Sequence, residues 1–289
     1  MFVNGEILKP EINWYNGLKP QQRTIAWISG GAASAVSCIL AANQFDNIHF
    51  AFCDTHIESP DTYRFIADLE KVLGDKIHFY ESEDFYDPES VWDKFIGLNF
   101  ANGAPCSTYL KRTVRVKQVQ DIETDYCQIF GFDNRKVEIN RAVNMVCNYP
   151  EINPKFPLIE FEMGRPEIFK TLKQLNIKAP IAYEDFNNNN CLGAPDSPKG
   201  GCIQGGIGYW QKINEKYPLK YEFMANKEHE LSARKGKPIT ICKDQRNATK
   251  GNRLFLKFNP EFPDVGTIDE IKGRQPVGYF ECNGFCGTR

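Results

Sequence analysis

Short apolar runs alternate with helix-like segments through the first part of this 289-residue chain. Four of these runs have the length and composition of buried β-strands, namely residues 24–29, 48–54, 76–82 and 126–132. The helix between the second and third runs is well marked, because Ser59 is a predicted N-cap, Pro60 follows at the first helical position, and Gly74 ends it. Strands separated by helices join through right-handed crossovers into a mostly parallel sheet. We therefore expect an α/β fold, with a mostly parallel, twisted sheet flanked by helices.

The character of the sequence changes near Pro150. An apolar segment follows, then helix-like segments, a stretch rich in Asn, Gly and Pro that holds cysteines, and an irregular tail. We predict two parts, with residues 1–150 forming the core. Residues 151–289 would form a helical, cysteine-containing C-terminal extension that packs on it.

Composition excludes several classes of protein. A net charge of −2 predicts no broad basic surface of the kind that holds duplex nucleic acid. No apolar run reaches the roughly 18 residues of a transmembrane helix, and the N-terminus lacks the pattern of a signal peptide. We expect a cytoplasmic protein without a membrane partner. Its 10 cysteines would then serve metal binding or catalysis rather than disulfide bonds.

The segment ISGGAASAV, residues 28–36, joins the first strand to the next helix. The adjacent glycines Gly30 and Gly31 allow a sharp turn and a close approach to a ligand, and the helix behind them offers free N–H groups to a phosphate or sulfate. Ser29 and Ser34 add hydroxyl groups. The alternative is a glycine turn that serves only the crossover. We call the predicted binding site for a phosphate or sulfate at these residues the anion seat. It requires that the two glycines line a cavity at the edge of the sheet.

Other polar and glycine positions fall at the same edge of the predicted sheet. Asp54 ends the second strand and Gly131 ends the fourth, as the glycine pair ends the first. Parallel sheets bind ligands at the carboxyl ends of their strands. The sequence therefore predicts a ligand site at this edge.

The glycine loop resembles the phosphate loop of the PP-loop superfamily, which includes ATP pyrophosphatases and phosphoadenylyl-sulfate (PAPS) reductases. Ala32 and Ala33 stand where the pyrophosphatases usually carry Lys-Asp, so the loop is closer to the reductase branch. Three further segments resemble the reductases in the same order. They are an Asp-Thr segment with a downstream Pro-x-Thr-Tyr (residues 53–71), a cysteine followed by basic residues (residues 106–117), and a Gly…Arg…Arg-Ala segment (residues 131–142).

The resemblance implies an enzyme whose core, residues 1–150, is a PP-loop, Rossmann-like domain that binds an adenine nucleotide: PAPS, APS or ATP. In the family the Asp-Thr pair lies beside the nucleotide, and arginines of the later segment can meet its anionic groups through bidentate hydrogen bonds. The predicted nucleotide contacts are Ser29, Gly30, Gly31, Ser34, Asp54, Thr55, Lys111, Arg112, Gly131, Arg135 and Arg141.

Five cysteines are candidate metal ligands. Cys191 and Cys202 flank a turn-rich loop, and Cys282 and Cys286 stand across a short turn near the C-terminus. Four thiolates that meet are the usual ligand set of an iron–sulfur cluster or a structural zinc. In iron–sulfur sulfonucleotide reductases one cysteine before the basic helix joins two far downstream, and Cys106, Cys191 and Cys202 follow that order. This chain departs from the family in having a single cysteine at 106 instead of adjacent twins, so both a [4Fe-4S] cluster and zinc stay open.

The C-terminal sequence FECNGFCGTR predicts a second role for the last cysteines. PAPS reductases carry a nucleophilic cysteine in a mobile C-terminal Glu-Cys-Gly segment, and both Cys282 and Cys286 resemble it. A thiolate that attacks sulfur needs a lowered pKa and access to the substrate. The candidate catalytic residues are therefore Cys282, Cys286 and Cys106, and the roles of ligand and nucleophile compete for them.

Three functions fit these patterns. The first is sulfonucleotide reduction by a thiol or an iron–sulfur cluster, with a thiol-reductant protein as partner. The second is ATP-dependent sulfur transfer to a nucleic acid, which the aromatic and basic helix with Trp210 and Lys212 would hold by stacking and charge. The third is a nucleotide-binding module without turnover, with structural zinc. Aromatic residues near the N-terminus, Phe2, Trp14 and Tyr15, predict either a packing arm or a homodimer contact.

Overall fold

The computed structural model describes residues 23–100, 103–120, 126–186, 190–246 and 251–273, together with the short strands β1 (Phe2–Val3) and β2 (Glu6–Ile7). Cys282 and Cys286 lie outside the described residues. Their predicted roles as metal ligands or nucleophile therefore stay predictions.

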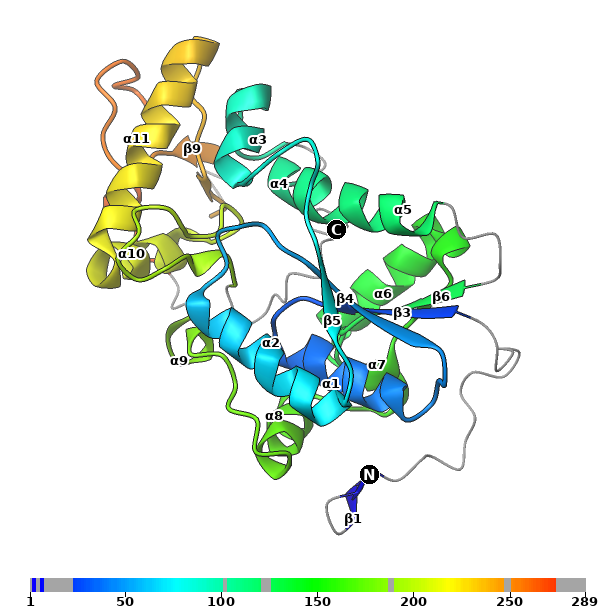
Figure 1. The fold of residues 1–289 in the computed structure, drawn as a ribbon. Helices are drawn as coiled ribbons and strands as arrows, with labels where there is room; N and C mark the ends of the chain where they lie inside the picture. Colours follow the sequence, from blue (N-terminus) through cyan, green and yellow to red (C-terminus); the bar gives the residue numbers. More distant parts are fainter. Residues whose placement is uncertain are drawn as a thin grey trace.

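A five-stranded parallel sheet forms the centre of the molecule (Figure 1). Its strand order is β5-β4-β3-β6-β7 and every neighbouring pair is parallel. The strands are β3 (Arg23–Ile28), β4 (Ile48–Cys53), β5 (Ile77–Tyr80), β6 (Tyr126–Ile129) and β7 (Pro154–Lys155). The first four are the predicted strands, and the predicted α/β fold class is confirmed. The two-residue β7 was not predicted.

Helices cover both faces of this sheet (Figure 1). One face carries α1 (Ala32–Ala42), α2 (Pro60–Leu73), α7 (Pro157–Glu160) and α8 (Arg165–Gln174), and the other carries α5 (Thr113–Val119) and α6 (Lys136–Asn148). Each face of the sheet packs on its helices through an apolar core, and successive side chains of β4 point to opposite faces. Phe50 and Phe52 lie in the first core, which includes α1 and α2, whereas Ala51 and Cys53 lie in the second core, which includes α5 and α6. The small residues of α1 let that helix lie deep in the first core.

The boundaries of α2 follow its local signals. The Ser59 side chain accepts a hydrogen bond from the Asp61 N–H, Pro60 occupies the first turn, and Gly74 ends the helix in the left-handed conformation with φ at 69°. Both helix ends were predicted from these same residues, and both are confirmed.

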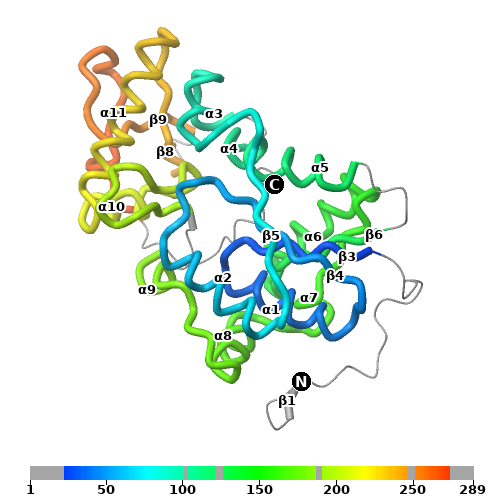
Figure 2. Tube along the Cα trace, in the orientation of Figure 1, coloured from blue at the N-terminus to red at the C-terminus, as the bar shows by residue number. Residues whose placement is uncertain are grey.

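The C-terminal part builds a separate apolar core beside the sheet (Figure 2). It comprises α10 (Ile207–Lys216), α11 (Pro218–Lys235) and the hairpin of β8 (Cys242–Asp244) and β9 (Asn252–Leu254). The first core continues as far as Ile177, beyond the predicted boundary at residue 150. The division of the chain into two domains stays a prediction.

Short helices connect these units. They are α3 (Pro88–Phe95), α4 (Pro105–Ser107), a π-helix (Thr108–Arg112), α9 (Ala182–Asp185) and the 3-10 turns Pro150–Ile152, Asn190–Leu192 and Ile268–Glu270. Within the described part of the chain, no helix has both the length and the apolar character needed to cross a membrane.

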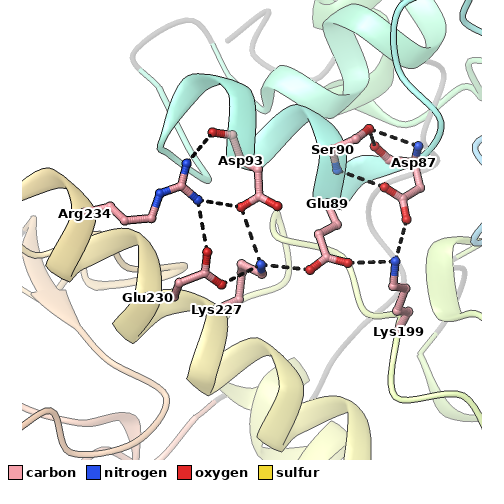
Figure 3. A network of polar contacts seen from close by, with 8 residues as sticks. All are labelled: Asp87, Glu89, Ser90, Asp93, Lys199, Lys227, Glu230 and Arg234. Atoms are coloured by element: carbon pink, nitrogen blue, oxygen red, sulfur yellow. Dashed lines mark hydrogen bonds and ion pairs between the residues drawn. The ribbon is translucent and has the colours of Figure 1, made fainter.

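A network of ion pairs ties α3 to the C-terminal part (Figure 3). Lys227 of α11 is 7% exposed at its side chain and lies 2.8 Å from Glu89 and 2.7 Å from Glu230. Lys199 lies 2.8 Å from Asp87 and 2.7 Å from Glu89, and hydrogen bonds to these two carboxylates raise the pKa of Lys199. Glu89 therefore links two lysines from different segments to one short helix.

Candidate active site

The Ser-Gly-Gly loop lies at the point where the strand order reverses. The chain moves from β3 outward to β4 and β5, then returns to place β6 on the other side of β3. Parallel α/β sheets bind ligands in the crevice at such a switch point, at the carboxyl ends of the strands. Gly30 has a φ of 79°, so the turn after β3 uses a conformation that strongly favours glycine.

The two serines of the loop are joined by hydrogen bonds. The Ser34 hydroxyl accepts a hydrogen bond from the Ser29 N–H at 3.0 Å and donates one to the Gly31 carbonyl at 2.9 Å. The two hydroxyl oxygens are 2.9 Å apart, and the Ser34 side chain is fully buried. Ser34 therefore fixes the loop from inside, and its contact with a nucleotide stays a prediction.

The glycine pair lies beneath other residues in this structure. Gly30 and Gly31 are both buried, and the Ala32 N–H at the start of α1 donates a hydrogen bond to the Tyr183 hydroxyl at 2.8 Å. The predicted anion seat requires the two glycines to line a cavity, so a phosphate would have to displace the atoms that bury them, and at the Ala32 N–H it would have to displace the Tyr183 hydroxyl. The anion seat also stays a prediction.

Gly131 is needed for close packing. A Cβ atom at this position would lie 2.4 Å from the Cα and 2.5 Å from the N of Ser34. Backbone at the end of β6 therefore contacts backbone in the first turn of α1, which only glycine permits. This packing role differs from the nucleotide contact predicted for Gly131, which stays a prediction.

Asp54 and Thr55 are both engaged at the end of β4. The Asp54 Oδ1 accepts hydrogen bonds from the Tyr63 hydroxyl at 2.8 Å and from the His56 N–H at 2.9 Å. The Thr55 hydroxyl donates to Glu58 Oε1 at 2.9 Å. Burial, and then the hydrogen bond to Asp54, raise the pKa of Tyr63. His56 itself has a φ of 60°, and such strained positions cluster at functional sites.

The basic segment after Cys106 contains a π-helix, a feature that was not predicted and that is frequent at functional sites. Lys111, at the end of this π-helix, is 6% exposed and lies 3.5 Å from the buried Glu58. Arg112 donates to the Tyr149 hydroxyl at 3.3 Å. Arg115, one turn further, is buried with its guanidinium 5.6 Å from the centre of the Phe130 ring. This segment therefore brings three cations to the sheet.

Each of the two predicted arginines pairs with a carboxylate that the sequence analysis missed. Arg135 lies 2.8 Å from Asp133, and Arg141 lies 2.9 Å from Glu138. Arg141 also stacks over Phe132, with its guanidinium 4.8 Å from the ring centre. Burial raises the pKa of Glu138, while Arg141 opposes that change. The signal for both pairs was local, since each carboxylate precedes its arginine by two or three residues.

The loop between Cys191 and Cys202 folds back on itself. The Gly201 N–H donates to the Cys191 carbonyl at 2.9 Å, and the Cys202 N–H donates to the Tyr209 hydroxyl at 3.2 Å. The Gly193 N–H donates to the Ile57 carbonyl at 2.9 Å, which places this loop beside the end of β4.

Cys106 packs against the same apolar cluster as this loop. Within the residues that the structure describes, no group of three or more His, Cys, Asp or Glu side chains is placed to hold a metal ion. The described cysteines thus do not by themselves form a ligand set.

Lys220 organises the cysteine loop and was missed by the sequence analysis. It is fully buried, and its ammonium group donates to the carbonyls of Ala194 at 2.5 Å, Ser197 at 2.6 Å and Lys199 at 3.3 Å. Burial lowers the pKa of Lys220. A single lysine therefore serves three backbone acceptors between the two cysteines.

The helix proposed to hold nucleic acid does not expose its tryptophan. Trp210 is fully buried in the C-terminal core, so its ring is not available for stacking on a base. Lys212 donates to the Asp185 carbonyl at 2.8 Å. Nothing in this geometry favours the nucleic-acid alternative.

Residues 23–123 match the family model of the phosphoadenosine phosphosulfate reductase domain. This stretch includes the glycine loop, the Asp54 strand end and the Cys106 segment, so the resemblance predicted from those residues is confirmed there. A solved structure of PAPS reductase from Candida auris, in a phosphate complex, is similar at a TM-score of 0.41 and 11% identity, covering 59% of this chain and 86% of that one. No curated protein sequence matches the chain.

Proposed function

Since residues 23–123 match the PAPS reductase domain, we propose that the chain is a sulfonucleotide reductase-like enzyme of the cytoplasm. Its substrate would be an adenine nucleotide with a transferable sulfate, bound at the carboxyl edge of the sheet between β3 and β6. The observation that carries this proposal is the position of the Ser-Gly-Gly loop. The loop lies within the matched segment and at the switch point of the sheet, where nucleotides bind in such folds.

The proposed contacts divide by chemistry. Backbone N–H groups of the loop and of the α1 N-terminus would meet a phosphate or sulfate oxygen. Lys111, Arg112, Arg135 and Arg141 would balance the remaining negative charge, and Asp54 and Thr55 would lie beside the adenosine. Ion pairs already hold Lys111, Arg135 and Arg141 in place, so less side-chain entropy is lost when they contact a ligand.

The proposed reaction is thiolate attack on the sulfate sulfur. A bond forms between the cysteine sulfur and the sulfate sulfur, and the bond from that sulfur to the phosphate oxygen breaks. The nucleotide leaves with the electron pair, as adenosine bisphosphate when PAPS is the substrate. A thiol-reductant protein then releases sulfite by attacking the cysteine, and a second thiol reduces the resulting disulfide. Cys282, Cys286 and Cys106 are the candidate nucleophiles.

The same proposal includes a bound metal, either a [4Fe-4S] cluster or zinc. Its candidate ligands are Cys106, Cys191, Cys202, Cys282 and Cys286. Anaerobic purification followed by metal analysis and visible absorption tests it. Protein that contains neither iron nor zinc would refute the metal site.

The central experiment measures binding of PAPS, APS and ATP by calorimetry, together with release of sulfite and pyrophosphate. Gly30→Ala should weaken nucleotide binding, because an added Cβ at a φ of 79° strains the loop. Gly74→Ala is the matched control. Gly74 has a φ of 69° with no atom within 4 Å of an added Cβ, so it carries a similar strain away from the site.

Equal loss of affinity in both glycine variants would show that strain alone, rather than the loop, affects binding. Failure of all three nucleotides to bind the wild-type chain would refute the proposal. Pyrophosphate release from ATP without sulfite release from PAPS or APS would favour ATP-dependent sulfur transfer instead.

A further inference from the structure

The first N–H group of α1 is occupied by a side chain from a distant part of the sequence. The Tyr183 hydroxyl accepts the Ala32 N–H at 2.8 Å, and 151 positions separate the two residues. The Tyr183 ring packs edge-on against Phe169, with ring centres 5.1 Å apart, and the Arg165 guanidinium lies 5.5 Å from its centre. These contacts hold an oxygen atom at the point where a helix N-terminus favours an anion.

A phosphate oxygen and the Tyr183 hydroxyl would compete for the same donor. The first N–H groups of a helix have no partner within the helix, and they are the groups that hold phosphates. Tyr183 supplies a neutral oxygen to one of them, whereas a phosphate would supply a charged oxygen and a stronger hydrogen bond. Gly30 and Gly31 are also buried, so a ligand that contacts them must displace the atoms that cover them.

The segment that carries Tyr183 is anchored on both sides. Before it, the Ile181 N–H donates to Asp61 at 2.6 Å, and Arg64 donates to the Lys178 carbonyl at 3.0 Å. Both Asp61 and Arg64 belong to α2. After it, Phe186 packs on Tyr209 of α10 with ring centres 5.1 Å apart. The four-residue helix α9 thus spans from the sheet core to the cysteine-bearing part, with Tyr183 between the two anchors.

We propose that Tyr183 is a gate residue that occupies the anion seat in the free protein and leaves it when a nucleotide phosphate binds to the Ser-Gly-Gly loop. This inference rests on the proposed nucleotide site. It assigns to α9 a function that the nucleotide contacts do not include, which is to keep the loop closed until a ligand competes for the Ala32 N–H.

Tyr183→Phe separates the hydroxyl from the ring. The variant keeps the packing on Phe169 but lacks the oxygen that accepts the Ala32 N–H, so nucleotide binding no longer displaces a hydrogen bond. Adenosine 3′,5′-bisphosphate, which does not turn over, is the probe. Its Kd should fall about fivefold in the variant, the equivalent of one ordinary hydrogen bond. Tyr126→Phe is the control, because it removes a hydroxyl at the opposite, amino-terminal edge of the sheet and should leave Kd unchanged.

Hydrogen exchange on the wild-type chain gives an independent readout. Binding of adenosine 3′,5′-bisphosphate should slow exchange in residues 29–36 and accelerate it in residues 178–186, because the loop gains a ligand while α9 loses its contact. Slower exchange in both segments would overturn the gate and would indicate that Tyr183 helps to hold the ligand.

The calorimetric outcomes distinguish the two proposals. Unchanged or weaker binding in Tyr183→Phe, with clear binding to the wild-type chain, overturns the gate and leaves the nucleotide site intact. Absence of binding to both proteins overturns both, since the variant removes the competing oxygen and still accepts no nucleotide. Detectable binding to the wild-type chain together with tighter binding to the variant supports both.

Discussion

Glu228 makes the stability of the C-terminal part depend on pH. This residue of α11 has no solvent exposure, and its two carboxylate oxygens accept the N–H groups of Ile241 at 2.6 Å and Leu256 at 2.7 Å. Burial raises its pKa from an ordinary value of 4.5 to about 8, although the two N–H donors act in the opposite direction. The side chain thus joins α11 to the residue before β8 and to the segment after β9 while it holds a proton across the neutral range.

The sign of the effect follows from where the proton is bound. Above pH 4.5 the unfolded chain releases the proton of Glu228, whereas the folded protein keeps it up to about pH 8. The contribution of Glu228 to the free energy of unfolding is therefore complete below pH 4.5. It falls by about 1.4 kcal/mol per pH unit as the pH rises from 4.5 to about 8. Across the window the loss amounts to about 5 kcal/mol.

Urea unfolding followed by tryptophan fluorescence measures this loss, because Trp92 and Trp210 are buried in the same apolar core as the hairpin. Glu228→Gln should remove most of the slope between pH 5 and pH 8. It should also cost about 1–3 kcal/mol at pH 5, because the amide NH2 group faces a backbone N–H. Glu215→Gln, on the exposed side of α10, is the control and should keep the wild-type slope. An identical slope in Glu228→Gln and the wild type would refute the reasoning.

Three further predictions concern packing and charge. Gly131→Ala should cost about 2–3 kcal/mol and lower Tm, because its Cβ would lie 2.4 Å from the α1 backbone, whereas Gly206→Ala has no atom within 4 Å and should change Tm little. Lys220→Met should cost about 1–3 kcal/mol in urea unfolding, since buried carbonyls lose their donor; unchanged stability would mean that water replaces the ammonium group. Lys227→Met should lower the free energy of unfolding by about 3 kcal/mol, because it leaves carboxylates of α3 and α11 without their shared cation. Arg234→Gln, at a more exposed pair, should lower it clearly less. Equal losses in the two variants would contradict this ranking.

Local signals explain what could be predicted of the fold. Ser59, Pro60 and Gly74 define the ends of α2 through contacts within a few residues, and the four apolar runs define the strands of the sheet. The position of the glycine loop at the carboxyl edge follows from the order of these elements alone. Strand β7 has only two residues and no periodicity to detect, so no sequence pattern could indicate it.

The unpredicted features of the candidate site depend on contacts between distant residues. Tyr183 reaches Ala32 across 151 positions, and no motif near either residue indicates that contact. Lys220 stands in an amphipathic helix, where a lysine is ordinarily counted as exposed, yet it is fully buried because three carbonyls surround its ammonium group. Long-range packing decided both positions.

The cations at the carboxyl edge bear on how a nucleotide would be held there. Lys111 pairs with Glu58, Arg135 with Asp133 and Arg141 with Glu138, so the edge carries nearly as much negative as positive charge. A phosphate that binds there gains less from net charge, because three of the four proposed cations are already paired with carboxylates. Its affinity must come mainly from directional donors, which are the backbone N–H groups of the loop and the guanidinium groups that carboxylates hold in fixed orientations. Such donors are effective only when the ligand reaches them without intervening water or protein atoms. The Tyr183 hydroxyl accepts a hydrogen bond from one of these donors, the Ala32 N–H. For the affinity of a nucleotide at this site, breaking that single neutral hydrogen bond would therefore matter more than the attraction of distant charges.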